Sequence, residues 1–242
     1  MITISFIGTK KYKNFFPGFY ESINNFFCND EEKLILVSTD EPEHDFFKVK
    51  NVKIKKIEHK EWPYVTLHRF KYLLDFKEEI LNSKLFFFID ADLWPSSKIE
   101  LKEIDPFDKK FVGVQHPGFL NKIGTFETNT KSLANIFDNT YDLKIYRQGC
   151  FWGGKSESII EMIEELDRRI DVDSSNGVVA RWHDESHMNK YFLERNELVR
   201  TLHAGFAQPE KGYEEIRRKF ETKMIHLSKR DDDYPRFPGG KI

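Results

Sequence analysis

The sequence has little cysteine and no long apolar run. Two cysteines, Cys28 and Cys150, occur among 242 residues, and two are too few for a disulfide framework or a zinc ribbon, so we expect a reducing compartment. No apolar run approaches the roughly 20 residues that a membrane-spanning helix needs, and the chain does not open with a basic region followed by a long apolar core. We therefore expect a soluble, cytoplasmic protein without a membrane span.

An excess of charge of either sign is also missing. Lys and Arg number 38 against 40 Asp and Glu, which gives a formal net charge of −2, so the total charge does not favour nucleic acid as a partner. The length predicts one large domain or two small ones, and 23 phenylalanines suit a large packed core. Nothing in the composition predicts an oligomeric state.

What the chain does have is a short apolar run that stops at two carboxylates. Residues 85–89 are all large and apolar without alternation, which is typical of a strand buried on both faces of a parallel sheet. Asp90 and Asp92 follow at its carboxyl end, where open α/β sheets bind ligands. Their oxygens suit one hard cation, Mn²⁺ or Mg²⁺, that keeps positions open for substrate phosphates. The alternative is that the two aspartates only solvate the strand end or start a turn.

Predicted strands and predicted helices alternate along the chain. Strand patterns at residues 2–7, 33–38, 52–57 and 85–89 alternate with helical patterns at 10–27 and 66–81. Further on we expect strands at 111–114 and 146–152, the latter ending at Gly153-Gly154, helices at 156–170 and from 182, and loops at 120–145. This alternation predicts an α/β fold with a Rossmann-like, mostly parallel central sheet and flanking helices.

The acidic and histidine residues around position 185 have simpler explanations that must be weighed. Asp184 and Glu185 complement the N-terminal end of a helix dipole. His183 and His187 have zinc-ligand spacing, but the metalloprotease pattern needs Glu directly after the first His, where Asp184 stands. Phosphatases of the haloacid-dehalogenase type carry Asp-x-Asp-x-Thr/Val, whereas Trp94 occupies that last position. The zinc and phosphatase hypotheses are therefore weak.

Several short motifs follow one another in a characteristic order. The decapeptide at residues 182–191, Trp-His-Asp-Glu-Ser-His-Met-Asn-Lys-Tyr, differs at one position from the signature of glycosyltransferase family 6. Smaller motifs agree with it in order: Lys-Lys-Tyr at 10–12, Thr-Asp-Glu-Pro at 39–42, Trp62 seven residues before Arg69, His-Pro-Gly-Phe at 116–119, Thr-Phe-Glu at 125–127, Phe-Trp-Gly-Gly at 151–154, and Asp173 with Asn176-Gly177. The chain thus resembles this family, which includes the histo-blood-group A and B transferases and the α-1,3-galactosyltransferases, over residues 2–229.

The resemblance implies a GT-A fold and a retaining transfer of galactose or N-acetylgalactosamine from its UDP donor, in α-1,3 linkage, to a galactose-containing glycan acceptor. It implies a single catalytic domain over residues 1–242, with a nucleotide-binding half (1–92), an acceptor-binding half (93–230) and a flexible C-terminal tail (231–242). Many bacterial members with Asn-x-Asn work without metal, so Asp90-Ala91-Asp92 resembles the metal-dependent branch. Mn²⁺ is the expected cofactor, with Mg²⁺ as the alternative.

The resemblance also implies roles for single residues. Glu185 is the expected catalytic residue, either as a nucleophile or as the group that stabilises an oxocarbenium-like transition state. Asp90 and Asp92 would hold the metal against the diphosphate. The donor-binding positions are Ile7, Gly8, Thr9, Tyr12, Arg69, Asp90, Ala91, Asp92, Gln148, Gly149, Cys150, Asp184 and Lys229. The acceptor-binding positions are His116, Thr125, Trp182 and Glu210, the last in a loop that differs from the vertebrate members.

The choice of donor sugar and the role of the basic C-terminal segment, which the resemblance also addresses, stay open. Gln148 and Cys150 align with the family's donor-selecting pair: the size of Cys150 favours galactose, whereas Gln148 can hydrogen-bond an acetamido group. The basic segment that ends at Lys229-Arg230 is expected to fold over the donor diphosphate as a lid, and the alternative is a solvated helix or strand edge.

Structural roles and a second function are the remaining alternatives. Gly8 also fits a turn, Tyr12 the core, Arg69 a surface salt bridge, and His116 a loop. A catalytically silent module that binds nucleotide sugars or glycans would keep the same fold. The intact pair of aspartates at 90 and 92 together with Glu185 argues against silence, because a silent binder has less use for all three.

Overall fold

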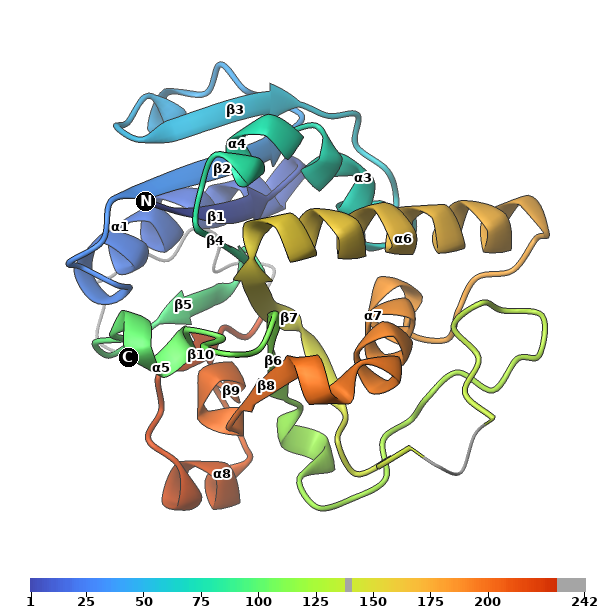
Figure 1. Ribbon diagram of the computed structural model, residues 1–242. Coiled ribbons are helices and arrows are strands. Elements are labelled where there is room, and N and C mark those ends of the chain that lie inside the picture. Colours follow the sequence, from blue (N-terminus) through green and yellow to red (C-terminus); the bar gives the residue numbers. More distant parts are fainter. Residues whose placement is uncertain (138–140, 230–242) are drawn as a thin grey trace.

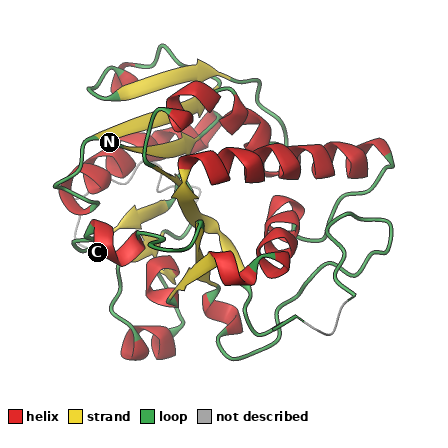
Figure 2. Ribbon diagram, viewed as in Figure 1, coloured by secondary structure: helices red, strands yellow, loops and turns green. Residues whose placement is uncertain are grey.

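A central sheet with helices on both faces forms the body of the protein (Figure 1). This computed structural model describes residues 1–137 and 141–229. Arg230 and the predicted tail at 231–242 lie outside the described residues. The described part of residues 120–145 is loop with one short 3₁₀ turn before it, as the sequence predicts (Figure 2).

The central sheet has seven strands in the order β3-β2-β1-β4-β7-β6-β8. β1 pairs in parallel with β2 and β4, β2 with β3, and β6 with β8, whereas β7 runs antiparallel between β4 and β6. The predicted α/β fold with a mostly parallel sheet is therefore confirmed. The strands are β1 (Ile2–Ile7), β2 (Lys33–Thr39), β3 (Val52–Lys56), β4 (Leu85–Ile89), β6 (Phe111–Gln115), β7 (Arg147–Lys155) and β8 (Val199–Leu202).

Strand β4 lies between two hydrophobic cores, one on each face of the sheet. Phe87 and Ile89 belong to the core that includes α1, and Phe86 and Phe88 belong to the core that includes α3, α4, α6 and α7. Successive side chains of a strand point to opposite faces, which explains why the run is apolar without alternation. The helices are α1 (Phe16–Phe26), α2 (Tyr64–Leu67), α3 (Arg69–Leu74), α4 (Lys77–Leu81), α5 (Leu101–Ile104), α6 (Ser156–Ser175), α7 (His183–Glu194) and α8 (Glu214–Lys219), with 3₁₀ turns at Lys10–Phe15, Asp45–Phe47, Pro117–Phe119, Asn196–Leu198 and Ala204–Ala207.

The prediction of one helix over residues 66–81 was wrong, because this segment forms the three short helices α2, α3 and α4. The breaks fall at His68 and Phe76, whose backbone angles leave the helical region. Phe76 is completely buried beside Phe70 and Ile80 in the core under α6. Tertiary packing of these apolar side chains overrides the local helical pattern.

The strand predicted at residues 146–152 is confirmed as β7, but its predicted end at Gly153-Gly154 is one residue early. β7 continues through both glycines to Lys155. A Cβ on Gly153 would lie 2.3 Å from the carbonyl oxygen of Phe86, and one on Gly154 would lie 2.2 Å from that of Lys110. The glycines thus allow neighbouring strands to approach closely, so here they belong to the strand and do not form a turn.

A second, smaller sheet brings the C-terminal segment beside the Asp-x-Asp motif. Its order is β5-β10-β9, with β5 at Leu93–Pro95, β9 at Gln208–Pro209 and β10 at Met224–His226. β10 pairs antiparallel with β5, which directly follows Asp92. The sequence does not predict this sheet, because its strands are very short and distant in sequence.

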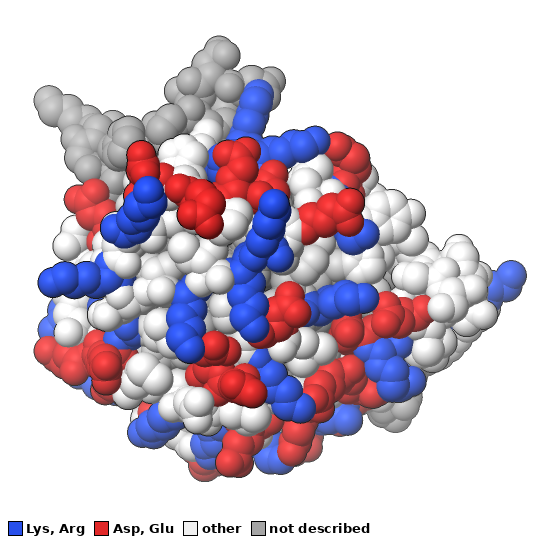
Figure 3. Space-filling model, turned by 90° about the horizontal axis from the view of Figure 1, so that it is seen from above, with Lys and Arg blue, Asp and Glu red and all other residues white. Residues whose placement is uncertain are grey.

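Charged side chains of both signs lie together on one face of the molecule (Figure 3). On the face seen from above, acidic and basic side chains intermingle (Figure 3). The ion pairs Lys53–Glu79 and Lys77–Glu164 connect neighbouring elements.

Among the residues that the structure describes, no helix combines the length and the apolar character that crossing a membrane requires.

Candidate active site

A cavity of about 600 Å³ opens where β1 and β4 end. Many of the predicted donor-binding residues line it: Ile7, Thr9, Tyr12, Arg69, Asp90, Ala91, Asp92 and Lys229. The parallel strands place their carboxyl ends at one edge of the sheet, so residues from positions 7 and 90 meet there. The segment before α3 closes another side through His59, Glu61, Trp62, Val65 and Thr66.

The Asp-x-Asp motif forms a tight turn at the floor of this cavity. The Asp90 N–H donates to the carbonyl oxygen of Cys150 at 2.9 Å, and the Leu93 N–H donates back to the carbonyl oxygen of Asp90 at 2.9 Å. The Trp94 indole N–H donates to the carbonyl oxygen of Ala91 at 3.0 Å. Both carboxylates are therefore held beside each other by the backbone.

Arg69 joins three parts of the site from beneath the cavity. Its guanidinium donates to the carbonyl oxygen of Gly149 at 2.8 Å, lies 2.9 Å from Asp184 Oδ2 and 3.4 Å from Asp90 Oδ1, and stacks over the Phe88 ring. Burial disfavours its charge, but the surrounding carboxylates raise the pKa of Arg69 above its ordinary value. Burial also disfavours the charge of Asp184 and raises its pKa to about 7, although the Arg69 guanidinium favours the ionised carboxylate. The alternative of a surface salt bridge for Arg69 is therefore wrong, because these contacts form a buried network.

Asp90, Asp92 and His226 form a group that can hold a cation. One ligand atom from each lies within 4.8 Å of the others. Atoms on opposite sides of a divalent cation lie about 4 to 5 Å apart, because metal–oxygen distances are about 2.0 to 2.6 Å. The donor set of two carboxylates and one imidazole suits a divalent cation, so the residues fit the metal that the sequence predicts. Across the described ranges this is the one such group of three or more side chains.

Asp92 is the most strongly paired of these carboxylates. It is 2% exposed, with His226 Nε2 at 3.2 Å from Oδ1 and Lys229 Nζ at 3.2 Å from Oδ2. Burial opposes ionisation, but these two cationic partners hold the pKa of Asp92 at about 2. Lys229 Nζ also lies 5.3 Å from the centre of the Tyr12 ring. Lys229 therefore connects the candidate metal-binding group with the predicted uridine side.

Glu185 lies in the first turn of α7, with its carboxylate held from two directions. The Tyr146 hydroxyl donates to Oε1 at 2.6 Å, and the Gly149 N–H donates to Oε2 at 2.7 Å. Burial raises the pKa of Glu185, whereas both hydrogen bonds lower it. Gly149 thus contacts Glu185 through its N–H and Arg69 through its carbonyl oxygen, which joins the two predicted halves of the site.

Tyr146 also contacts two of the predicted acceptor-binding residues, His116 and Thr125. Its ring packs 5.7 Å from His116 and its buried hydroxyl interacts with Thr125. Thr125 Oγ1 in turn accepts the Trp182 indole N–H at 2.8 Å. Burial lowers the pKa of His116 to about 4, helped by the nearby His226. Three of the four acceptor-binding predictions therefore lie in one contiguous group.

Glu210, the fourth predicted acceptor residue, makes contacts within the C-terminal segment. Its carboxylate accepts the Ser228 N–H at 2.8 Å, and its own N–H donates to the carbonyl oxygen of His226 at 2.9 Å. Glu210 is thus placed to support β10, and its contact with an acceptor stays a prediction.

The predicted uridine-binding residues follow β1. A Cβ on Gly8 would lie 2.7 Å from the Phe6 ring, so the close approach here needs glycine. Thr9 is buried and its hydroxyl lies 2.8 Å from His59 Nδ1. Tyr12 is partly exposed in the cavity wall, which does not match the alternative of a core tyrosine.

The predicted donor-selecting pair lies on β7 beside the catalytic centre. Gln148 is half-buried, and within the described chain its Oε1 has no hydrogen-bond partner. Cys150 is buried, and burial raises its pKa well above the ordinary value, so the thiol is neutral. Neither residue lines the cavity at the strand ends, so the selection of the donor sugar by this pair stays a prediction.

Sequence reasoning missed His226, Tyr146 and His59 as site residues. His226 was part of an undivided basic segment, and its position depends on the pairing of β10 with β5. Tyr146 was predicted only as the start of a strand. The one available signal for Tyr146 was its place immediately before Arg147 and the donor-selecting pair.

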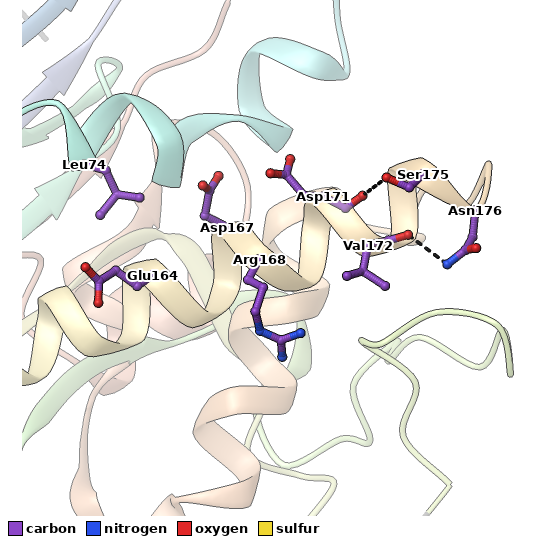
Figure 4. Close-up of a pocket in the computed structure, with 8 residues that line it drawn as sticks. All are labelled: Leu74, Glu164, Asp167, Arg168, Asp171, Val172, Ser175 and Asn176. Atoms are coloured by element: carbon purple, nitrogen blue, oxygen red, sulfur yellow. Dashed lines mark hydrogen bonds between the residues drawn. The ribbon is translucent and has the colours of Figure 1, made fainter.

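A second hollow, of about 440 Å³, lies along the outer side of α6 (Figure 4). It is lined by Leu74, Glu164, Asp167, Arg168, Asp171, Val172, Ser175 and Asn176. The Ser175 hydroxyl and the Asn176 amide bond to carbonyl oxygens of their own helix. None of the predicted site residues lines this hollow, so the cavity at the strand ends is the candidate active site.

Comparisons with known proteins agree with the motifs that build this site. The model of glycosyltransferase family 6 matches residues 1–229. The O-antigen biosynthesis glycosyltransferase WbnI of Escherichia coli is 32% identical over 216 residues, which cover 87% of this chain and 89% of that protein. Histo-blood group ABO system transferase 1 of Rattus norvegicus is 28% identical over 203 residues, 79% of this chain and 56% of that protein. Globoside alpha-1,3-N-acetylgalactosaminyltransferase 1 of Gallus gallus is 33% identical over 85 residues, 34% of this chain and 24% of that protein.

Proposed function

Since the chain belongs to glycosyltransferase family 6, we propose that it moves galactose or N-acetylgalactosamine from a UDP donor to a galactose-containing glycan. The proposed transfer retains the anomeric configuration, forms an α-1,3 linkage and depends on Mn²⁺, with Mg²⁺ as the alternative cation. The observation that carries the proposal is the continuous connection from Asp90 through Arg69 and Gly149 to Glu185.

The cavity supports binding of a nucleotide diphosphate sugar. Ile7, Thr9 and Tyr12 would contact the uridine, since they line the side of the cavity that follows β1. Lys229, whose ammonium lies beside the Tyr12 ring and Asp92, would donate to the diphosphate. Arg69 would orient the sugar, together with the Asp184 carboxylate that it holds.

Asp90 and Asp92 would hold the cation on the floor of the cavity, where their side chains lie together. When bound, the cation would neutralise the negative charge that grows on the departing UDP. The nearby guanidinium of Arg69 fixes Asp90 in place before the donor arrives. Until a cation binds, Lys229 and His226 balance the charge of Asp92.

Glu185 is the proposed catalytic residue. Its carboxylate could attack the anomeric carbon and displace UDP, which forms a glycosyl-enzyme. The acceptor hydroxyl would then attack the same carbon, lose its proton and release the Glu185 carboxylate. Alternatively, Glu185 could stay non-covalent and stabilise an oxocarbenium-like transition state. Both roles need an ionised carboxylate in a fixed position, which is what the bonds from Tyr146 and Gly149 favour.

The acceptor would bind beside Glu185, at the group formed by His116, Thr125 and Trp182. Trp182 is 44% exposed, and an exposed indole ring offers a flat apolar surface to a sugar. The His116 imidazole stays neutral through most of the pH range, because burial lowers its pKa. In the same proposal, residues 1–92 form the nucleotide-binding half and residues 93–230 the acceptor-binding half of one domain.

The alternative is a catalytically silent module that binds the nucleotide sugar. The hydrogen bonds to Glu185 argue against it, because they hold a buried carboxylate that binding of UDP alone does not need. The direct test is release of UDP from UDP-galactose and from UDP-N-acetylgalactosamine, with Mn²⁺ or EDTA, using lactose and 2′-fucosyllactose as acceptors. We expect release that needs the metal and rises with acceptor. Tight Mn²⁺-dependent binding of UDP without any release would favour the silent module.

A further inference from the structure

We propose that His226 is a third protein ligand of the active-site cation, through Nε2, beside Asp90 and Asp92. This inference rests on the proposed metal-dependent function and adds a nitrogen ligand that the Asp-x-Asp motif does not contain. It assigns a specific role to a residue on the C-terminal strand β10 and connects this strand directly to the reaction centre.

The backbone fixes His226 next to the motif. β10 pairs antiparallel with β5, with His226 opposite Leu93, the residue after Asp92. The Leu227 N–H donates to the carbonyl oxygen of Asp92 at 2.9 Å. On the other side of β10, the Glu210 N–H donates to the carbonyl oxygen of His226 at 2.9 Å. His226 therefore lies on a strand held from both sides, which is a more exact scaffold for a ligand than a free loop.

The side-chain geometry agrees with ligation. His226 Nε2 lies 3.2 Å from Asp92 Oδ1, and the ligand atoms of the group of three lie within 4.8 Å of one another. Asp92 is 2% exposed and the His226 side chain 21% exposed, so the group is largely shielded from water. Arg69 approaches Asp90 with its guanidinium 3.4 Å from Oδ1. The ligand atoms are thus assembled by the protein itself.

Lys229 provides the contrast within the same segment. Its ammonium lies 3.2 Å from the other oxygen of Asp92, but an ammonium group has no lone pair with which to bind a metal. It can balance the charge of Asp92 through Oδ2 but cannot itself ligate a cation. An imidazole can do both, because it donates a hydrogen bond when protonated and ligates a metal when neutral.

A nitrogen ligand changes the expected choice of cation. Mg²⁺ prefers oxygen ligands in a strict octahedral arrangement, whereas imidazole suits transition metals. We therefore expect Mn²⁺ and Co²⁺ to bind more tightly than Mg²⁺. The His226→Ala variant should lose Mn²⁺ affinity by about 10- to 100-fold, the range in which even outer partners of metal ligands act. The affinity of this variant for Mg²⁺ should fall less, so it should prefer Mn²⁺ over Mg²⁺ by a smaller factor than the wild type does.

The test uses Mn²⁺ itself, added to the full chain with UDP, and reads nitrogen coupling by pulsed electron paramagnetic resonance. We expect a histidine nitrogen coupling in the wild type that changes with ¹⁵N-histidine labelling and disappears in His226→Ala. The matched control is His59→Ala, which removes the histidine that lines the cavity and should keep the coupling. Absence of the coupling in the wild type, or its persistence in His226→Ala, would overturn the inference.

Folding controls and separate measurements of Mn²⁺ binding and sugar transfer distinguish a failure of this inference from a failure of the proposed function. His226→Gln keeps a polar side chain, and circular dichroism of both variants shows whether the chain is still folded. If the wild type shows the nitrogen coupling but transfers no sugar, the ligand assignment stands and the proposed function fails. If the wild type transfers sugar with Mn²⁺ while folded His226→Ala keeps its Mn²⁺ affinity, the function stands and the ligand assignment fails.

Discussion

At the scale of single residues, Tyr146 and Arg69 carry most of the connections in the site. Tyr146 touches His116 and donates to Glu185, while Arg69 touches Asp90 and Asp184. Both side chains are buried. A buried hydrogen bond to a charged group contributes more than one at the surface, and its loss leaves an unsatisfied partner.

Replacing Tyr146 with Phe should raise the pKa of Glu185, because the hydroxyl bond stabilises its ionised form. Activity needs the carboxylate, so the acidic limb of kcat/KM should move to higher pH. We also expect kcat to fall about 10- to 100-fold, as for loss of a hydrogen bond to a charged group. The pH profile of kcat/KM is the measurement. Tyr20→Phe, which removes a distant hydroxyl that bonds to the Lys50 carbonyl oxygen, is the control, and an unmoved acidic limb in Tyr146→Phe would contradict this role for Tyr146.

Replacing Gln148 with Leu should change the choice of donor. Gln148 Oε1 is buried without a hydrogen-bond partner among the described residues, so a donor sugar that reaches it can satisfy it with the N–H of an acetamido group. Leu removes that acceptor with little change in size. We expect kcat/KM for UDP-N-acetylgalactosamine to fall about 5- to 10-fold relative to UDP-galactose, the value of one neutral hydrogen bond. Competition between the two donors measures the ratio, and an equal effect on both donors would rule out this contact.

Motifs with local spacing were accessible from the sequence at the residue scale. Asp90, Asp92 and Glu185 stand in short signatures, and the structure places Asp90 and Glu185 near Arg69 and Asp92 beside Asp90. His226 and Tyr146 were not accessible in this way. Their positions depend on pairing between distant segments, and a single sequence contains no local sign of that pairing.

At the scale of elements, the C-terminal strand β10 decides what the basic segment does. The predicted lid is in part a strand of the second sheet, so its residues up to His226 are already fixed beside the motif. Lys229, three residues later, is 52% exposed on its side chain and lies in the cavity wall. Among the described residues of this segment, Lys229 is therefore the one that we expect to cover the diphosphate.

Deletion of residues from Lys229 onward should raise the donor KM by about tenfold or more, because a charged donor to the diphosphate is lost. A deletion of residues 231–242 keeps Lys229 and is the matched control, with kinetics expected to stay near those of the full chain. Initial-rate kinetics with varied donor give the measurement. Equal KM values for the two deletions would disprove the proposed role of Lys229.

Element types were predictable where local pattern and packing agree. The buried run of β4 and the strands β1, β2 and β3 follow directly from their apolar patterns. The segment at 64–81 deviates because Phe70, Phe76 and Ile80 must all reach the core under α6. Gly153 and Gly154 were predicted to end the strand one residue early, because a close approach between strands is visible only in three dimensions.

At the scale of the whole molecule, the buried His187 and the half-buried His116 couple folding to pH. His187 is completely buried beside Asp173, and burial lowers its pKa to about 4, although the carboxylate attracts its charged form. Burial lowers the pKa of His116 in the same direction. A group with a lowered pKa binds fewer protons in the folded chain than in the unfolded chain. The free energy of unfolding should therefore fall as the pH drops from about 6.5 towards 4.

Replacing His187 with Gln should make that fall shallower, because Gln cannot take up the proton. For His187 the expected loss in the wild type is about 3 kcal/mol by pH 4. Urea unfolding at a series of pH values gives the slope. His44→Gln, at an exposed histidine, should keep the wild-type slope, and an unchanged slope in His187→Gln would contradict the assignment.

The overall architecture was predictable because strands and helices alternate regularly in the first part of the chain. The antiparallel insertion of β7 between β4 and β6 was not predictable, since strand order depends on long-range pairing. That insertion brings Gly149 and the donor-selecting pair beside the end of β4. The reaction centre therefore depends on the part of the topology that the local patterns do not contain.

The most direct test of the account is the structure of the product formed from UDP-galactose and lactose with Mn²⁺. Nuclear magnetic resonance of the isolated product identifies the new linkage and its anomeric configuration. We expect a lactose extended by one galactose in α-1,3 linkage, and we expect this product to disappear in Glu185→Gln and Asp92→Asn. Free galactose with unchanged lactose, or a β-linked product, would contradict a retaining transfer at this site.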